Sequence, residues 1–248
     1  MISGLYSAAT GMDAASVRHE VSAENLAHAH LPGYRRRRVQ QSTFNQLLSQ
    51  HKGTAAGYAK TNGASVGVEG NRNLTIDFSH GPQKHTGRNL DVALDGDGFF
   101  AVEGPDGPLY TRSGSFFVSS EGQLVTIDGL RVSGANGDIQ IPPNTSSEQI
   151  VVSRDGELSV DGVAFGQLQI VDIPETSDLV IAGNSLFRST GAAPEPSDAS
   201  VYSGQLEMAN VSHMEELINI MVASRQYEAS QKALRTIEQS VGRHISGN

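Results

Sequence analysis

The sequence predicts an α+β fold: paired, coiled-coil-like N- and C-terminal helices flank a central all-β domain of hairpins, and an extended, loop-rich segment lies between. Both ends lack proline and place apolar or small residues in alternating steps of three and four, which is typical of paired helices. The body instead alternates Asp-Gly pairs with short β-branched and aromatic runs, which is typical of hairpins. We therefore expect a helical domain of residues 1–30 plus 204–248, a connecting segment 31–79 and a β-rich domain 80–203.

The first helix is expected from Met1 to about His30, where Pro32-Gly33 ends it. Its apolar and small residues form a narrow stripe made of Ile2, Leu5, Ala9, Met12, Ser16, His19, Ala23 and Leu26. Gly4 and Gly11 each cost roughly 1 kcal/mol of helix stability relative to Ala. The helix therefore needs a partner.

Residues 31–79 fit neither class well. They contain many glycines and few apolar runs, so the segment is expected to be extended, with one short helix from about Ser42 to Gln50.

The β domain is expected where turn signals are dense. Asp-Gly pairs begin at residues 95, 97, 106, 128, 155 and 161, and Asn136-Gly137 and Glu121-Gly122 add two more. The strands expected between them are Gly98–Val102, Leu109–Thr111, Phe116–Val118, Leu124–Ile127, Ile150–Ser153 and Leu168–Ile173.

The second helix is expected between about Gly204 and Gly242. Its stripe consists of Ile220, Ala223, Tyr227, Ser230, Leu234, Ile237 and Val241, and an adjoining stripe consists of Met214, Leu217 and Met221. Charged residues occupy the opposite face, so the helix is amphipathic.

Composition excludes several classes of protein. A net charge of -9 over 248 residues argues against binding a nucleic-acid backbone, and the absence of cysteine excludes disulfides and thiol chemistry. No apolar run is long enough to insert into a membrane, and no cleavable secretion signal is recognisable, so any export must use another route.

No motif for catalysis, cofactor or metal binding emerges. Nucleophile-elbow, P-loop and dinucleotide patterns are missing, so the chain is not expected to be an enzyme. His28, His30 and Glu24 are potential metal ligands, but the two histidines stand only two residues apart, whereas ligands on a helix stand three or four apart, and no fourth ligand is evident nearby. Asp91, Asp95 and Asp97 do not follow the calcium-loop register and are interpreted as turn residues.

The one dense basic run is Arg35–Arg38. Two interpretations stay open: a docking patch for an acidic groove on a neighbouring subunit or for lipid headgroups, and a solvated patch after a helix.

Both ends of the chain carry recognisable motifs. Asn25-Leu26-Ala27 and Pro32-Gly33-Tyr34-Arg35 resemble the opening of bacterial flagellar rod and hook proteins, although His28 and Leu31 stand where Asn and Thr are usual. The block Asp77–Gly129 is similar to the strand-turn block of the rod branch, and Gly204–Val241 is similar to the closing helix of the family.

The resemblance implies a structural rod subunit of the flagellar basal body, most similar to proximal-rod members and next to distal-rod members. It implies export through the flagellar type III apparatus without cleavage. It also implies that copies of this chain and other rod subunits form a tube in the periplasm, in which the terminal helices of the subunits lie inside and their β domains outside. The expected assembly residues are Ile2, Leu5, Met12, Asn25, Leu26, Tyr34, Arg35, Asn210, Val211, Met214, Leu217, Met221, Tyr227, Leu234 and Ile237.

A competing hypothesis is a secreted β-rich binding module or glycan hydrolase. It predicts a concave site with converging polar groups and termini that pack onto the body of the same chain.

Overall fold

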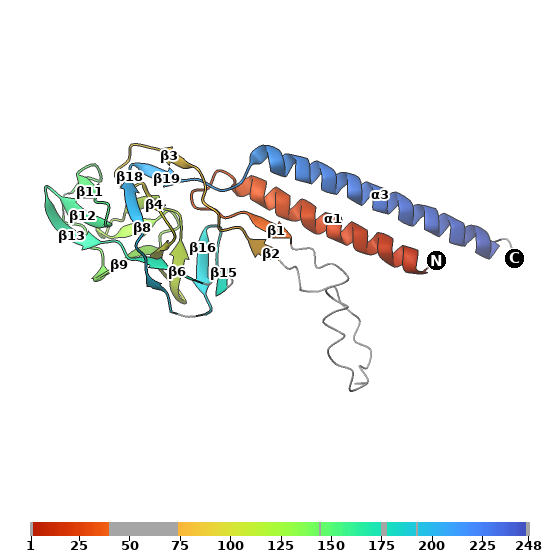
Figure 1. Cartoon of the computed structure of the whole chain (residues 1–248), viewed down its shortest axis with the longest axis horizontal. Coiled ribbons are helices and arrows are strands. Elements are labelled where there is room, and N and C mark those ends of the chain that lie inside the picture. Colours follow the sequence, from red (N-terminus) through yellow and green to blue (C-terminus); the bar gives the residue numbers. More distant parts are fainter. Residues whose placement is uncertain (1, 40–73, 144, 175–177, 192, 247–248) are drawn as a thin grey trace, which may run out of the picture. The chain divides into compact units, whose positions relative to one another are not determined.

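A computed structural model describes residues 2–39, 74–143, 145–174, 178–191 and 193–246 (Figure 1). The short helix expected at residues 42–50 lies outside the described residues. The chain divides into two compact units. The first comprises Met1–Glu24, Arg37–Asp77 and Met214–Asn248, and the second comprises Asn25–Arg36 and Phe78–His213.

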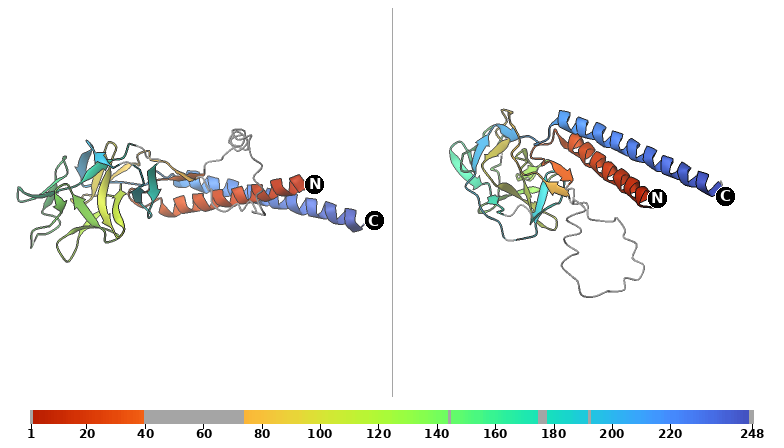
Figure 2. Two further views of the ribbon diagram at one scale, coloured as in Figure 1. Left: turned by 90° about the horizontal axis from the view of Figure 1, so that it is seen from below. Right: turned by 45° about the vertical axis from the view of Figure 1, so that its right-hand side comes forward.

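The first unit contains most of two long helices, α1 (Ile2–His28) and α3 (His213–Ser246). They lie side by side and run in opposite directions (Figures 1 and 2). The same unit contains the strands β1 (Arg37–Val39) and β2 (Leu74–Ile76), which pair antiparallel.

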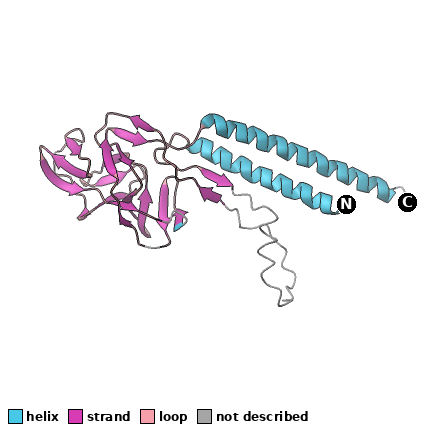
Figure 3. Cartoon of the chain, in the orientation of Figure 1, coloured by secondary structure: helices cyan, strands magenta, loops and turns pink. Residues whose placement is uncertain are grey.

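The second unit is built of short antiparallel strands (Figure 3). Its first nine are β3 (Gln83–His85), β4 (Val92–Asp95), β5 (Phe99–Gly104), β6 (Gly107–Thr111), β7 (Phe116–Val118), β8 (Leu124–Thr126), β9 (Arg131–Gly134), β10 (Gly137–Asp138) and β11 (Ile150–Val152). The others are β12 (Glu157–Val160), β13 (Val163–Gln167), β14 (Ile170–Asp172), β15 (Leu179–Ile181), β16 (Leu186–Ser189), β17 (Glu195–Pro196), β18 (Ser200–Ser203) and β19 (Gln205–Glu207).

The main sheet has the order β15-β16-β6-β5-β9-β8-β7, with β10, β14 and β17 attached beside this path. The strands β11, β12 and β13 form a separate sheet, and the pairs β18-β4 and β19-β3 bring the end of the unit back to its beginning. The polypeptide therefore enters and leaves the β-rich unit along neighbouring strands.

The turn chemistry accounts for the strand boundaries. The glycine of each expected turn pair has a positive φ: Gly96, Gly98, Gly107, Gly122, Gly129, Gly137, Gly156 and Gly162. Between β12 and β13, Asp161 and Gly162 have φ of 52° and 81°, the left-handed pair that a two-residue hairpin turn needs. Each of the six expected strand runs overlaps an observed strand.

One apolar cluster fills the second unit. Phe100 and Phe116 are buried at its centre, edge to face, with ring centroids 5.2 Å apart. Leu124 adds a further side chain from the main sheet, and Ile150, Leu158 and Val201 add side chains from the other sheets. The core therefore joins strands from the whole length of the unit.

The second helix begins later than expected. The prediction of a helix from about Gly204 is wrong, because Gln205–Glu207 pairs with β3 as strand β19 and α3 begins only at His213. Neither helix, over the described residues, contains a segment long and apolar enough to span a bilayer.

Candidate assembly surfaces

The motif residues that follow α1 meet those that precede α3 within the second unit. We call this cluster the junction and define it as Asn25, Gly33, Tyr34, Arg35, Arg112, Glu207, Asn210 and Val211. It contains the sequence-predicted residues Asn25, Tyr34, Arg35, Asn210 and Val211.

Gly33 brings the turn after α1 against the β-rich unit. Its backbone N–H donates to the carbonyl of Glu207 at 2.8 Å, and its φ is 70°. A Cβ at this position would stand 2.2 Å from the backbone nitrogen of Ser113, so no larger residue fits. The Pro-Gly motif is therefore required by close backbone approach as well as by the end of the helix.

Tyr34 fills the apolar side of the junction. Its ring is buried with Ala29, Ala209 and Val211 and stacks on His28 at a centroid distance of 5.1 Å. Its hydroxyl donates to Asn25 Oδ1 at 3.1 Å, so the buried phenol is hydrogen-bonded. Asn25 and Tyr34 are thus a matched pair across the end of α1.

Glu207 is the polar centre of the junction. Its buried carboxylate accepts hydrogen bonds from Arg35 Nη1 at 2.8 Å, from Arg112 Nε at 2.7 Å and from the Gly81 N–H at 2.8 Å. Arg112 also donates to the carbonyl oxygens of Gly98 and Gly96. Each of the three donors to the carboxylate places a positive charge or an N–H group against it, which is what a buried carboxylate requires.

The electrostatic balance of Glu207 follows from these contacts. Burial alone would raise the pKa of the Glu207 carboxyl. The charges and hydrogen bonds of Arg35 and Arg112 outweigh burial and hold that pKa below its ordinary value. Glu207 is therefore an anion in the folded chain at neutral pH.

The side-chain amide of Asn210 links the segment after α1 to the segment before β3. Its Oδ1 accepts the backbone N–H of Arg36 at 2.7 Å, and its Nδ2 donates to the carbonyl of Ser79 at 2.9 Å. The neighbouring Val211 lies in the apolar cluster around Tyr34. Asn and Val at these positions thus serve hydrogen bonding and packing respectively.

Three arginines of the basic run form ion pairs within the chain. Arg35 is buried against Glu207, and in the first unit Arg37 pairs with Glu24 and Arg38 pairs with Asp77 at 2.7 Å. The solvated-patch interpretation is wrong for Arg35, because its guanidinium is removed from water by an internal ion pair. Sequence analysis missed Glu207 and Arg112, since neither lies near the basic run in the sequence.

The helices of the first unit meet through small residues. A Cβ on Gly4 would lie 3.4 Å from Ile237 Cδ1, and a Cβ on Gly11 would lie 3.1 Å from Ser230 Oγ. Seven residues forward on α1 therefore correspond to seven residues back on α3, as in two helices that run antiparallel.

The buried stripe of α1 differs from the predicted one. Ala8, Ala15 and Ser22 are buried, whereas Ala9, Ser16 and His19 of the predicted stripe are exposed. The prediction is displaced by one residue because glycine and alanine let the helices approach closely along the neighbouring stripe. Met12 and Leu26 are half-buried, and the structure does not describe the side chains of Ile2 and Leu5.

Most of the predicted stripe of α3 is buried or half-buried. Ala223 is buried, and Ile220, Ser230, Leu234 and Ile237 are half-buried, whereas Tyr227 is 39% exposed. The structure does not describe the side chain of Val241.

A second apolar surface remains open on α3. Met214, Leu217 and Met221 are 68%, 45% and 52% exposed, and the sequence analysis did not single out Ile218 and Val222, which are exposed beside them. We call these five residues the open stripe. Scattered exposed apolar residues are ordinary, but five within nine positions of one helix form a continuous surface.

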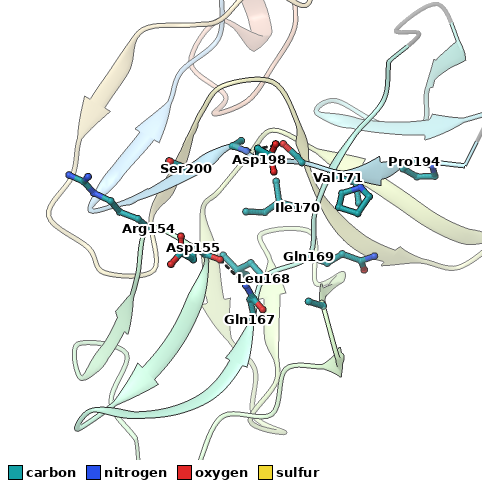
Figure 4. A pocket seen from close by; sticks show the side chains of 14 residues that line it. Arg154, Asp155, Gln167, Leu168, Gln169, Ile170, Val171, Pro194, Asp198 and Ser200 are labelled. Carbon is teal, nitrogen blue, oxygen red and sulfur yellow. Dashed lines mark hydrogen bonds between the residues drawn. The ribbon is translucent and has the colours of Figure 1, made fainter.

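A cavity of about 520 Å³ lies in the second unit (Figure 4). It is lined by polar side chains that include Arg154, Gln167 and Gln169, and by the apolar Leu168 and Ile170. Its described lining contains neither histidine nor cysteine. Its lining also includes the carboxylates of Asp155 and Asp198.

The residues considered as metal ligands have other partners. Glu24 pairs with Arg37 in the first unit, and His28 stacks on Tyr34 in the second. The described part of the chain contains no group of three metal-ligating side chains.

Comparisons with known proteins agree with both motif-bearing regions. Residues 93–160 match the family model described as the flagellar hook protein FlgE/F/G D1 domain, and residues 202–246 match the flagellar basal body rod FlgEFG protein C-terminal model. The junction residues Glu207, Asn210 and Val211 lie inside the second match.

Curated relatives match over nearly the whole chain. The flagellar basal-body rod protein FlgG of Bacillus subtilis (strain 168) is 34% identical over 263 residues, covering 96% of each chain. FlgG of Agrobacterium fabrum is 33% identical, covering 94% of each. The flagellar basal-body rod protein FlgF of Rhizobium meliloti (strain 1021) is 30% identical over 249 residues, covering 99% of this chain and 97% of the relative.

Proposed function

The chain belongs to the flagellar basal-body rod protein family, and we propose that it polymerises into the rod through its terminal helices. Members of this family are structural proteins. The partners are further copies of this chain and other rod subunits.

The open stripe of α3 is the observation that carries the proposal. α3 directs one stripe toward α1 and still exposes five large apolar side chains on another. Full burial of such a side chain is worth about 1.5–3 kcal/mol, so covering the open stripe would contribute several kcal/mol to association. A head-to-tail contact that does not close on itself extends into a helical tube.

Ten of the fifteen expected assembly residues divide into three roles under this proposal. Met214, Leu217 and Met221 contact neighbouring subunits directly, and Leu234 and Ile237 pair with α1 in a coiled-coil-like manner. The junction residues Asn25, Tyr34, Arg35, Asn210 and Val211 act indirectly, because they fix the chain where α1 ends and α3 begins.

Two charge-adding substitutions on α3 test the proposal. Met221→Glu places a carboxylate on the open stripe, whereas Gln226→Glu adds the same charge at an exposed position outside it. We expect Met221→Glu to abolish incorporation into rods and Gln226→Glu to assemble normally, with equal helical content by circular dichroism. Normal rods from Met221→Glu would contradict the proposal.

Within the family, we propose a proximal-rod, FlgF-like position. The match to the Rhizobium FlgF extends over 249 residues, close to the 248 of this chain, whereas the match to the Bacillus FlgG extends over 263. The higher identity to FlgG favours the distal rod as the second candidate. Restored motility in a strain lacking FlgF, but not in one lacking FlgG, would support the first; the reverse result would support the second.

We also propose that the chain reaches the periplasm through the flagellar type III apparatus. The family membership supports this route. Secretion of the full chain should stop in a strain without that apparatus, and continued secretion there would contradict the proposal.

A further inference from the structure

Two histidines that are distant in the sequence meet in the second unit. His30 follows α1, and His213 is the first residue of α3. Their Nε2 atoms are 3.2 Å apart, and both side chains are exposed. The contact joins segments separated by 183 residues.

The geometry of the pair differs from that of an end-to-end hydrogen bond. The ring centroids are 4.5 Å apart, the two Nε2 atoms are 3.2 Å apart, and the ring planes are inclined by 43°. A linear N–H···N bond would align the rings end to end and place the centroids further apart. The two rings approach each other more closely than such an alignment allows.

This separation suits two ligands of one metal ion. Zinc binds imidazole nitrogen at about 2.0–2.1 Å, and tetrahedral geometry then places neighbouring nitrogens roughly 3.3 Å apart. Neutral imidazole is a preferred ligand of zinc, nickel and copper, whereas magnesium and calcium prefer oxygen.

We propose that His30 and His213 together bind a divalent transition-metal ion through their Nε2 atoms. In the described part of the chain no third metal-ligating side chain completes the group, so water occupies the other coordination positions. The site differs from the trio of Glu24, His28 and His30 considered from sequence, because the partner of His30 comes from the far end of the chain.

Metal binding at this pair would stabilise the junction. The ion would cross-link the segment after α1 to the start of α3, and the unfolded chain would separate the two ligands. At a metal concentration 100 times the dissociation constant, a chain of this size should gain about 5–10 °C in unfolding midpoint.

Thermal unfolding of the full unassembled chain tests the proposal. Midpoints are measured with increasing zinc chloride or nickel chloride, and with magnesium chloride as the control ion. We expect the midpoint to rise with zinc and nickel and to stay constant with magnesium.

Substitutions identify the ligands. His30→Gln and His213→Gln should each remove most of the zinc-dependent rise, whereas His85→Gln, at an exposed histidine on β3, should keep it. Copper(II) bound to the wild-type chain should show two equatorial nitrogens by electron paramagnetic resonance, and one in either single variant.

An unchanged midpoint in the wild-type chain, or an equal rise in His213→Gln, would overturn the proposal. Because these measurements use the monomer, a negative result leaves the assembly proposal intact, and failed assembly leaves the metal site intact.

Discussion

Arg112 donates through Nε to the carboxylate of Glu207 at 2.7 Å, although 95 residues separate them and both side chains are only 2% exposed. The same carboxylate holds Arg35, 172 residues earlier in the chain. One anion thus connects the turn after α1, the middle of the β-rich unit and the strand before α3.

Replacing Glu207 by Gln should destabilise the chain by about 3–5 kcal/mol, because it removes the anion and leaves two buried guanidinium groups without it. Urea unfolding of the full chain measures the change. Glu195→Gln makes the same chemical change at an exposed position and should be neutral within about 0.5 kcal/mol. A loss for Glu207→Gln below about 1 kcal/mol would show that the junction does not depend on the ion pairs.

The lowered pKa of Glu207 predicts a specific acid sensitivity. A carboxyl whose pKa is lower in the folded chain stabilises it fully above the ordinary value of 4.5, and the contribution disappears as pH falls from there through the folded-state pKa. The stability gap between wild type and Glu207→Gln should therefore be constant near neutrality and narrow below about pH 4.5. Unfolding curves from pH 7 to pH 3 measure it, and a gap that persists unchanged in acid would contradict the assignment.

Local chemistry made much of the β-rich unit predictable. The glycine of each Asp-Gly pair adopts a positive φ for reasons contained in two residues, so strands such as Leu124–Thr126, which Asp128-Gly129 follows, could be bounded from sequence. The start of α3 was not predictable in this way. Gln205–Glu207 becomes a strand because β3 is there to pair with it, which is a tertiary effect.

The face of α1 shows a different limit. The predicted stripe through Leu5 and Met12 and the observed stripe through Ala8 and Ala15 both follow steps of three and four, and hydrophobicity favours the former. The stripe of small residues is the buried one, because it lets α1 approach α3 closely. Similarly, the partnership of Arg35 with Glu207 has no local signal, because ion pairs between distant segments leave none in the sequence.

Gly33→Ala should be far more damaging than Gly129→Ala. Both glycines have left-handed φ, 70° and 79°, so alanine carries a similar backbone strain of about 1–2 kcal/mol at either. A Cβ at residue 129 meets open space, whereas a Cβ at residue 33 meets the backbone of Ser113 at 2.2 Å. We expect a total loss of about 2–5 kcal/mol for Gly33→Ala by urea unfolding. Equal losses in the two variants would mean that the turn after α1 is not held against Ser113.

Gly11→Leu tests the register of α1 against α3. Leucine is a better helix former than glycine by roughly 0.8 kcal/mol, so propensity alone would raise helical content. At residue 11, however, even a Cβ lies 3.1 Å from Ser230 Oγ, and a leucine side chain cannot fit unless the helices separate. We expect lower helical content and a loss of about 1–3 kcal/mol, measured by circular dichroism during thermal unfolding.

Ala14→Leu provides the matched control for this register, because it places the same side chain three residues away at an exposed position of α1. It should leave helical content and unfolding unchanged within about 0.5 kcal/mol. If Gly11→Leu instead raised helicity, propensity would dominate, and the two helices could not be packed through Gly11 and Ser230. A specific loss at residue 11 alone would place the small-residue stripe of α1 between the helices, leaving Met12 and the open stripe of α3 for neighbouring subunits.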